Sequence, residues 1–493
     1  MSGDKIAYQG EFCPAVPPIR RNAQFKEYRR QLERMDQIIR STGADLKLAA
    51  SYVRHMGKYR KKEPSARQRK KDTCYSVQGL RCNILRHYLG VSFVELSCRI
   101  AESQLLQGFI GASAIDGTAK VPGKSLLFDY SKMLPAEELE LFIAVVTSSV
   151  IGDHGIAGLE EPVKADDVFA DACCLEADIH FPVDWLMLRD ETRTVMKSIK
   201  TIRRHGLFHR MRSPEKIMTE MNHLCMAMTG SRRKKHSEKE RKKVFRRMKK
   251  LEKVVRAHGW RYCGMLEGRW RETDLEEDEA LKIMRRMRNV LEQAPFVVRQ
   301  AHERIIGGRH VENSKKILSI YDPDVDVVVR GKADAEVEFG NVLYLAEQED
   351  GLIVDHRLYR RSAPGDTAKL DESLERMKAS GIDVKRFTAD RGFDAERTRK
   401  SLDLENIYNA ICPKDPAELE RRSGSVLFKK LQKRRAQTEG RISIVRNGFI
   451  GNPAKGRSFG KRRTDVAWAV FSHNLWVLAR LPEAKEEELL KAG

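Results

Sequence analysis

The chain has 493 residues, 33% of them charged and 41% hydrophobic, and a formal net charge of +22 at pH 7. This length predicts two to four domains, because a domain typically holds roughly 100 to 200 residues. No apolar run approaches the roughly 20 residues that cross a bilayer, and residues 1–10 lack the apolar core of a signal peptide, so we expect no membrane span and a location inside the cell. The nine cysteines are scattered without C-x-x-C spacing, which argues against a disulfide framework and a zinc ribbon.

The positive charge is concentrated in two segments. Residues 232–256 contain 14 Lys or Arg against three Glu, and residues 58–71 contain eight basic residues and one Glu. Either run alone is equally well explained as a solvated helix face. Two runs in so basic a chain favour a nucleic-acid partner, because each contact between a cation and a phosphate releases counterions.

The amino-terminal part predicts a helical domain. Residues 1–21 are expected to form a flexible arm, and residues 22–145 a helical domain that binds DNA or mediates dimerisation. Within it, apolar residues at helical spacing predict helices over 25–39 and 46–56. Residues 75–111 predict two helices joined by a tight turn, with Gly90 ending the first and a Ser92–Glu95 capping box starting the second. This helix-turn-helix spacing fits either plain helical packing or a DNA reader.

The remainder predicts an α/β core interrupted by a helical insertion. Residues 168–176 read as a strand, and residues 324–331, 341–348 and 352–360 as three more, the last two joined by a hairpin turn. Helices are expected over 368–380, 396–402, 425–446 and 465–481, and strands over 384–390 and 407–413. The predicted fold is a mixed sheet flanked by helices, split into residues 146–185 and 316–482 by a basic helical insertion over 186–315 and followed by a tail over 483–493.

Three acidic residues are placed where such a sheet would present them together. Asp171 lies in the first strand, Asp390 ends the strand 384–390, and Glu439 lies on the helix after the last strand. Carboxylates at close range repel one another, so their convergence would favour Mg²⁺ or Mn²⁺. Two such ions could drive an in-line displacement at phosphorus. The alternative is ordinary surface acids, and three neighbours compete with Asp171 for the first position: Glu176, Asp178 and Asp184.

The helix around Glu439 has its own pattern. Arg435, Glu439 and Arg446 are spaced by four and seven residues, so they share one helical face. They form either a surface salt bridge or a metal-binding carboxylate flanked by two phosphate contacts. Gly440 would let a backbone approach closely beside Glu439.

Five segments carry a resemblance to a known family. They are TADRGF at 388–393, the R-x3-E-x6-R helix at Glu439, and the segments 171–185, 466–481 and 80–111. In this order, with Asp390 and Glu439 separated by 49 positions, they resemble the DDE transposases of bacterial insertion sequences. The likeness covers most of residues 75–481.

This resemblance implies a ribonuclease H-like core in which Asp171, Asp390 and Glu439 bind two Mg²⁺ ions, with Mn²⁺ able to substitute. It also implies that a homodimer or higher oligomer recognises terminal inverted repeats, cleaves transposon-end DNA and joins it to target DNA in the bacterial cytoplasm. Two positions depart from the family signature, whose tyrosine is Gln432 here and whose final lysine is Arg446. The insertion also follows the first strand instead of preceding the glutamate helix, so hairpin-intermediate chemistry is not carried over.

Further residues are expected to contact DNA. Trp185 could stack on a flipped base, although an aromatic residue beside a proline turn is more often packing. His180 and His473 are expected to be structural. The basic residues expected to contact DNA are Arg391, Arg435, Arg446 and Lys332 of the core, and Arg232, Arg233, Lys234, Lys235, Arg241, Lys242, Lys243, Arg246 and Arg247 of the insertion.

Two other functions remain open from the sequence. One is a non-catalytic DNA-binding repressor or architectural protein with a decayed core, although such a core should have lost at least one of the three acids. The other is a ribonuclease H-like hydrolase without strand transfer.

Overall fold

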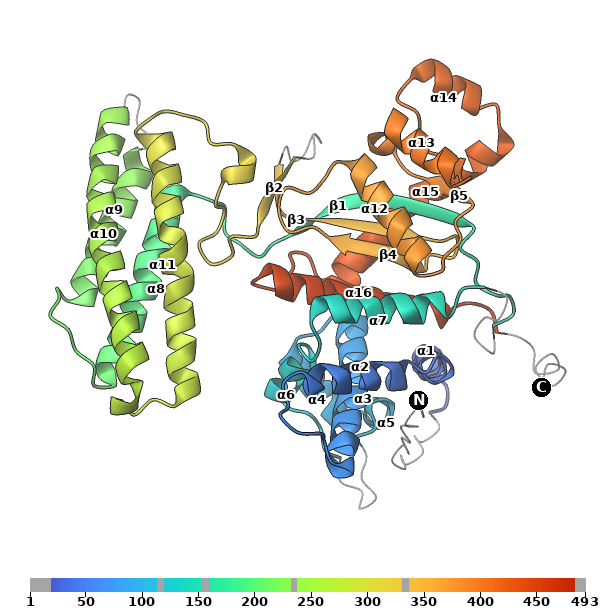
Figure 1. Cartoon of the computed structure of the whole chain (residues 1–493), viewed down its shortest axis with the longest axis horizontal. Coiled ribbons are helices and arrows are strands. Elements are labelled where there is room, and N and C mark those ends of the chain that lie inside the picture. The colour runs from blue at the N-terminus through green and yellow to red at the C-terminus, as the bar shows by residue number, and fades with distance from the viewer. Residues whose placement is uncertain (1–18, 113–118, 153–158, 232–236, 330–336, 484–493) are drawn as a thin grey trace.

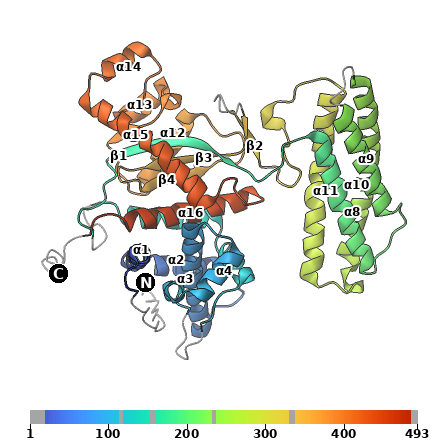
Figure 2. The same cartoon turned by 180° about the vertical axis from the view of Figure 1, so that it is seen from behind.

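The computed structural model describes residues 19–112, 119–152, 159–231, 237–329 and 337–483. Figures 1 and 2 show three parts: a group of amino-terminal helices, a mixed sheet with its covering helices, and a separate bundle of long helices. The α/β class that we predicted is confirmed. Among the described helices, none combines the length and the apolar composition that a bilayer crossing needs.

The amino-terminal helices form where the sequence predicted them. Ser65 caps the start of α3, and Gly90, with a positive φ of 63°, ends it. Ser92 then caps α4 by accepting a hydrogen bond from the backbone N–H of Glu95. The predicted pair joined by a tight turn is therefore present as α3 and α4. The bounds are α1 Ala23–Ser41, α2 Ala44–Gly57, α3 Ala66–Leu89, α4 Phe93–Glu102, α5 Gln104–Ile110, α6 Lys124–Tyr130 and α7 Ala136–Ser148.

These helices do not have a core of their own. Helix α16, Phe459–Leu478, lies between them and the sheet and is buried on nearly all sides. One continuous hydrophobic core includes Ile84 of α3, Trp468 of α16 and Leu345 of the sheet. The amino-terminal helices are thus packed rigidly onto the sheet through α16. Helix α16 starts six residues before the predicted position because Ser458 caps it.

The sheet has six strands in the order β2-β3-β1-β5-β6, with β4 also paired to β3. Strand β3 is antiparallel to β1, β2 and β4, whereas β5 and β6 are parallel to β1. The predicted hairpin is β3 and β4, and its turn uses Gly351 at a φ of 93°. The bounds are β1 Asp167–Glu176, β2 Asp326–Val329, β3 Val337–Glu347, β4 Ile353–Leu358, β5 Arg386–Thr388 and β6 Tyr408–Asn409.

The helices of this part follow the predicted order, with one addition. Helix α14 was not predicted, although Asp415 caps it and Pro416 occupies its first turn. Strands β5 and β6 are shorter than predicted, although the backbone N–H of Cys412 still donates to the carbonyl of Ala389 beyond their ends. The bounds are α12 Asp366–Ala379, α13 Glu396–Leu404, α14 Pro416–Arg422 and α15 Val426–Ile444, which continues into the π-helical segment η4, Val445–Ile450.

The insertion is a bundle with its own hydrophobic core. Its helices are α8 Asp184–Arg204, α9 Pro214–Ser231, α10 Glu238–Arg269 and α11 Glu277–Ile305. Asp184, which is buried, accepts hydrogen bonds from Gln300 and Arg304, so the start of α8 is tied to the end of α11. In Figures 1 and 2, α11 lies on the side of the bundle nearer the sheet, and α9 and α10 lie on the far side.

Two carboxyl groups are buried inside this bundle. Glu191 of α8 is fully buried, and neither of its side-chain oxygens has a hydrogen-bond partner among the described residues. Burial, and then the nearby carboxylate of Glu252, raise the pKa of Glu191 well above its usual value. Glu252 of α10 is also buried and forms an ion pair with Arg256 at 2.9 Å. The raised pKa favours the protonated form of Glu191 in the folded bundle, where a buried polar group without a hydrogen-bond partner is destabilising.

We expect Glu191→Met to stabilise the bundle. The free energy of opening, from hydrogen exchange of the slowest amides in α8, should rise by about 1–3 kcal/mol near neutral pH, because an unsatisfied polar group leaves the core. In the unsubstituted protein this free energy should fall as the pH rises above 4.5, the usual pKa of a glutamate side chain. The reason is that folded Glu191 retains a proton that the unfolded chain releases. The substitution should flatten this dependence. Glu240→Met, at an exposed position of α10, is the control, and equal behaviour of the two variants would contradict the account.

Candidate active site

Two of the predicted acids are brought together by strand register. Strands β1 and β5 are parallel neighbours, and Phe169 pairs with Thr388. Asp171 and Asp390 each lie two residues beyond this pair, so they reach the same level and the same face. The Asp171 carboxylate accepts a hydrogen bond from the backbone N–H of Ala172 at 2.7 Å. The Asp390 carboxylate accepts one from the N–H of Gly392 at 2.8 Å, which shapes the turn after β5.

The third acid is placed by helix α15. Gln432 on this helix donates a hydrogen bond to the carbonyl of Ala410 at 2.6 Å and lies 3.5 Å from the carbonyl of Ala389. It thereby ties α15 to the residues that follow β5 and β6. Glu439 lies seven residues later, two turns along the same helical face. Gln432, which stands where the transposase signature has a tyrosine, thus orients the helix that carries Glu439.

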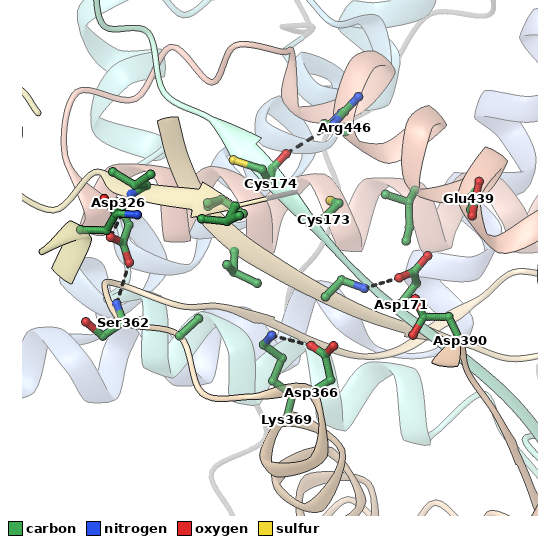
Figure 3. Close-up of a pocket in the computed structure, with 18 of the residues that line it drawn as sticks. Asp171, Cys173, Cys174, Asp326, Ser362, Asp366, Lys369, Asp390, Glu439 and Arg446 are labelled. Atoms are coloured by element: carbon green, nitrogen blue, oxygen red, sulfur yellow. Dashed lines mark hydrogen bonds and ion pairs between the residues drawn. The ribbon is translucent and has the colours of Figure 1, made fainter. Parts of the chain in front are cut away.

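A pocket of about 750 Å³ is lined by Asp171, Asp390 and Glu439. Figure 3 shows the carboxylates of Asp171 and Asp390 next to each other, with Glu439 on the neighbouring helix. Arg446 of η4 also lines this pocket and donates a hydrogen bond to the carbonyl of Cys174 at 3.4 Å. The structure therefore brings the three predicted acids and one of the two predicted arginines of α15 and η4 to one cavity.

The charges in this pocket influence one another. Burial, followed by the negative charges of Asp390 and Glu439, raises the pKa of Asp171 to about 6, against the lowering effects of the Ala172 N–H and of Arg435. None of the three acids forms an ion pair with another described residue. The Nε atoms of Arg435 and Arg446 are buried without a hydrogen-bond partner in the described part of the chain. The pocket thus holds carboxylates that repel one another, and the guanidinium group of Arg446 lies at its edge.

These residues fit a hard divalent cation. Carboxylate oxygens are the ligands that Mg²⁺ and Mn²⁺ prefer. A cation would offset both the burial and the carboxylate repulsion that raise the pKa of Asp171. Within the described ranges, no group of three or more His, Cys, Asp or Glu side chains is spaced as a ready-made metal cluster. The ligand types and their common pocket support the metal site, and the side chains are not preformed as a three-ligand cluster.

The carboxyl-terminal end of α15 is also fixed by the amino-terminal helices. His87 of α3 is buried, and burial lowers its pKa to about 3, so the neutral ring donates from Nδ1 to the carbonyl of Phe449 in η4 at 2.7 Å. A Cβ on Gly90 would lie 3.1 Å from the carbonyl oxygen of Gly448. Helix α3 therefore ends directly against the segment that carries Arg446.

The other predicted DNA contacts are spread over the surface. Arg391 is exposed beside Asp390, with its Nε 3.4 Å from the Cys412 sulfur. On α10, Lys243, Arg246 and Arg247 are exposed, while Arg241 is half-buried and Lys242 pairs with Glu238 at 2.5 Å. The predicted contacts that lie outside the described residues are Arg232, Arg233, Lys234, Lys235 and Lys332.

Trp185 requires a correction. It is only 8% exposed and belongs to the core of the bundle, where its indole N–H donates to the hydroxyl of Thr229 at 3.3 Å. Its ring faces are covered by packing, so it cannot stack on a base in this structure, and the stacking prediction was wrong. His180 pairs with Asp190 at 2.8 Å and His473 is fully buried, as expected of structural histidines.

Three charged residues that line the pocket were not predicted as site residues: Asp326, Asp366 and Lys369. Asp366 and Lys369 lie in the first turn of α12, whose start was predicted two residues too late. The signal available was the Pro364-Gly365-Asp366 segment, which resembles a helix start.

No protein-family model, curated protein or solved structure matches this chain. The candidate site therefore rests on the geometry of the chain itself and on the resemblance of its motifs.

We expect the carboxyl carbon of Asp171 to titrate with a midpoint of about 6 in protein labelled with ¹³C-aspartate. The midpoint should fall in Asp390→Asn, because a neighbouring negative charge is removed, while burial keeps it above the usual value. Asp403→Asn, an exposed position on α13, should leave it unchanged. A midpoint that is the same in both variants would show that Asp171 and Asp390 do not share a pocket.

Proposed function

We propose that this protein is a DDE transposase with a ribonuclease H-like core. The single observation that carries the proposal is the convergence of Asp171, Asp390 and Glu439 on one pocket, from two parallel strands and the helix across from them. The antiparallel β1-β3-β4 unit that continues into parallel strands with crossover helices supports this type of core. The motif resemblance adds the reaction class.

The chain's residues have separable tasks in this reaction. Asp171, Asp390 and Glu439 would hold the cations, and Gln432 orients the helix that presents Glu439. Two divalent cations bound by these carboxylates would supply activation of the attacking oxygen and stabilisation of the leaving oxygen. Arg446, which lines the pocket, and Arg435, whose charge acts on Asp171, would contact the phosphate of the strand being cut.

The proposed chemistry has two steps. In the first, a water oxygen attacks the phosphorus at the transposon end, and the bond from phosphorus to the 3′ oxygen breaks, which leaves a 3′-hydroxyl. In the second, this hydroxyl attacks a phosphodiester of target DNA and displaces another 3′ oxygen. Both steps are in-line displacements at phosphorus, so one pocket serves for both.

The bundle would hold DNA at a distance from the pocket. The exposed residues Lys243, Arg246 and Lys250 follow one another along α10 at spacings of three and four, which places them on one face. Because α10 lies on the side of the bundle away from the sheet, this face suits flanking or target DNA better than the strand being cut (Figure 2). Helix α4 is a weaker candidate for reading bases, because its exposed surface carries Glu95 and Glu102 with a single arginine, Arg99.

Asp390→Asn should abolish Mg²⁺-dependent nicking of a duplex that carries the inverted repeat flanking the coding sequence. We expect a loss of about a thousandfold or more, because a metal site supplies several kcal/mol to the transition state. The measurement is a gel assay of the labelled duplex, with strand transfer followed by joining to a target plasmid.

Asp383→Asn is the matched control, since this exposed residue precedes the same strand, β5. Full activity of Asp390→Asn would refute the proposed function. Binding of the repeat without cleavage by the unsubstituted protein would instead favour a non-catalytic DNA-binding protein, and cleavage without joined product would favour a hydrolase.

Alanine substitution of Lys243, Arg246 and Lys250 should weaken DNA binding with little dependence on sequence. The logarithm of the DNA association constant falls linearly with the logarithm of the salt concentration. The magnitude of this slope should decrease by up to about 2.7, because each lost phosphate contact removes about 0.9. The measurement is fluorescence anisotropy of labelled duplexes between low and moderate salt.

The matched control replaces three exposed lysines outside the bundle with alanine, so that both triple variants lose the same net charge. These lysines are Lys378, Lys385 and Lys400. If the control lowers the slope as much as the α10 variant, the α10 face is not a specific DNA-binding surface.

A further inference from the structure

The first turn of α12 carries a charged pair at the edge of the catalytic pocket. Lys369 donates a hydrogen bond from Nζ to Oδ1 of Asp366 at 2.8 Å. The Lys369 side chain is 8% exposed, whereas that of Asp366 is 34% exposed. Side chains on a helix lean toward its amino terminus, so a lysine at the fourth position reaches back to the first. The spacing of the two residues therefore brings them into contact in the first turn of α12.

The second oxygen of Asp366 lies against the turn that presents Asp390. A Cβ on Gly392 would lie 2.5 Å from Oδ2 of Asp366 and 3.0 Å from Oδ1 of Asp390. The two carboxylates thus flank the same glycine, and only a residue without a side chain leaves room for both. Asp366 is consequently a fourth acid beside the three that were predicted, and it lies against the turn that carries Asp390.

The ammonium of Lys369 faces the same pocket as the acids of the candidate metal site. Figure 3 shows Lys369 extending from α12 toward the pocket, with its ammonium bonded to Asp366 and with Asp171 and Asp390 beyond. An ammonium group without a partner would be attracted to the nearest carboxylates, particularly at a site with little water. The bond to Asp366 keeps this cation away from them.

We propose that Asp366 is a positioning residue of the metal site, which holds the Lys369 ammonium and seats the Asp390 turn so that Asp171 and Asp390 stay available to divalent cations. This inference rests on the proposed function, since it assigns Asp366 a task at that same site. Lys369, in turn, neutralises Asp366, so that the fourth carboxylate does not add to the repulsion among the other three.

The two residues should therefore behave differently when they are substituted. In Asp366→Asn the ammonium loses its ionic partner and competes with the metal for Asp171 and Asp390. Adding Lys369→Met removes the competitor. A residue that only stabilised the fold would give losses that accumulate in the double variant, whereas a positioning pair predicts recovery.

The test is Mn²⁺ binding to the full-length protein, measured by electron paramagnetic resonance of the free ion, so that no DNA substrate is needed. Asp366→Asn should weaken binding about tenfold, the smaller end of the effect of residues that support metal ligands. The double variant with Lys369→Met should regain most of that loss. Glu375→Gln, an exposed position on the same helix, is the matched control, and circular dichroism verifies folding of each variant.

The variant Asp390→Asn distinguishes the role of Asp366 from the existence of the metal site. If it abolishes binding while Asp366→Asn binds as the unsubstituted protein does, the role of Asp366 is refuted and the metal site stands. If Asp390→Asn leaves binding unchanged, the metal site itself is refuted. A double variant that binds no better than Asp366→Asn alone would overturn the part assigned to Lys369.

Discussion

The parallel pairing of β1 with β5 is the constraint on which the site depends. It joins residues more than 200 positions apart in the sequence, and the pair Phe169–Thr388 sets Asp171 and Asp390 at one level. A shift of this register by one residue would turn one of the two acids to the opposite face. The insertion can be long because it leaves β1 at its carboxyl end and returns at β2, so it does not interrupt this pairing (Figure 1).

Helices α12 and α15 and the segment η4 line other sides of the same pocket. Helix α15 brings Glu439 and is fastened at one end by Gln432 and at the other by η4, which the buried ring of His87 contacts. The amino-terminal helices thereby pack against the segment that continues the helix carrying the third acid. The bundle has a separate hydrophobic core, and the basic side chains of α10 lie on its own surface, away from the pocket.

Much of this arrangement could be predicted from the sequence, because the signals were local. The hairpin, the end of α3 at Gly90 and the helix face shared by Arg435 and Glu439 all follow from short patterns. The register could not be predicted, since β5 is three residues long and its hydrogen bonds are made with a distant strand. The sequence left packing and base stacking open for Trp185, because its burial depends on packing against helices such as α9, more than 40 positions away. Asp366 was missed because its importance lies in its contact with Gly392, which only the folded chain reveals.

The central claim is that two strands and one helix gather three carboxylates to bind divalent cations. The most direct measurement is an anomalous difference map from crystals of the protein soaked in Mn²⁺. The account predicts one or two peaks in the pocket, with oxygens of Asp171, Asp390 and Glu439 at roughly 2.0–2.5 Å from them. A map without a peak between these side chains, at Mn²⁺ concentrations that support DNA nicking, would contradict it.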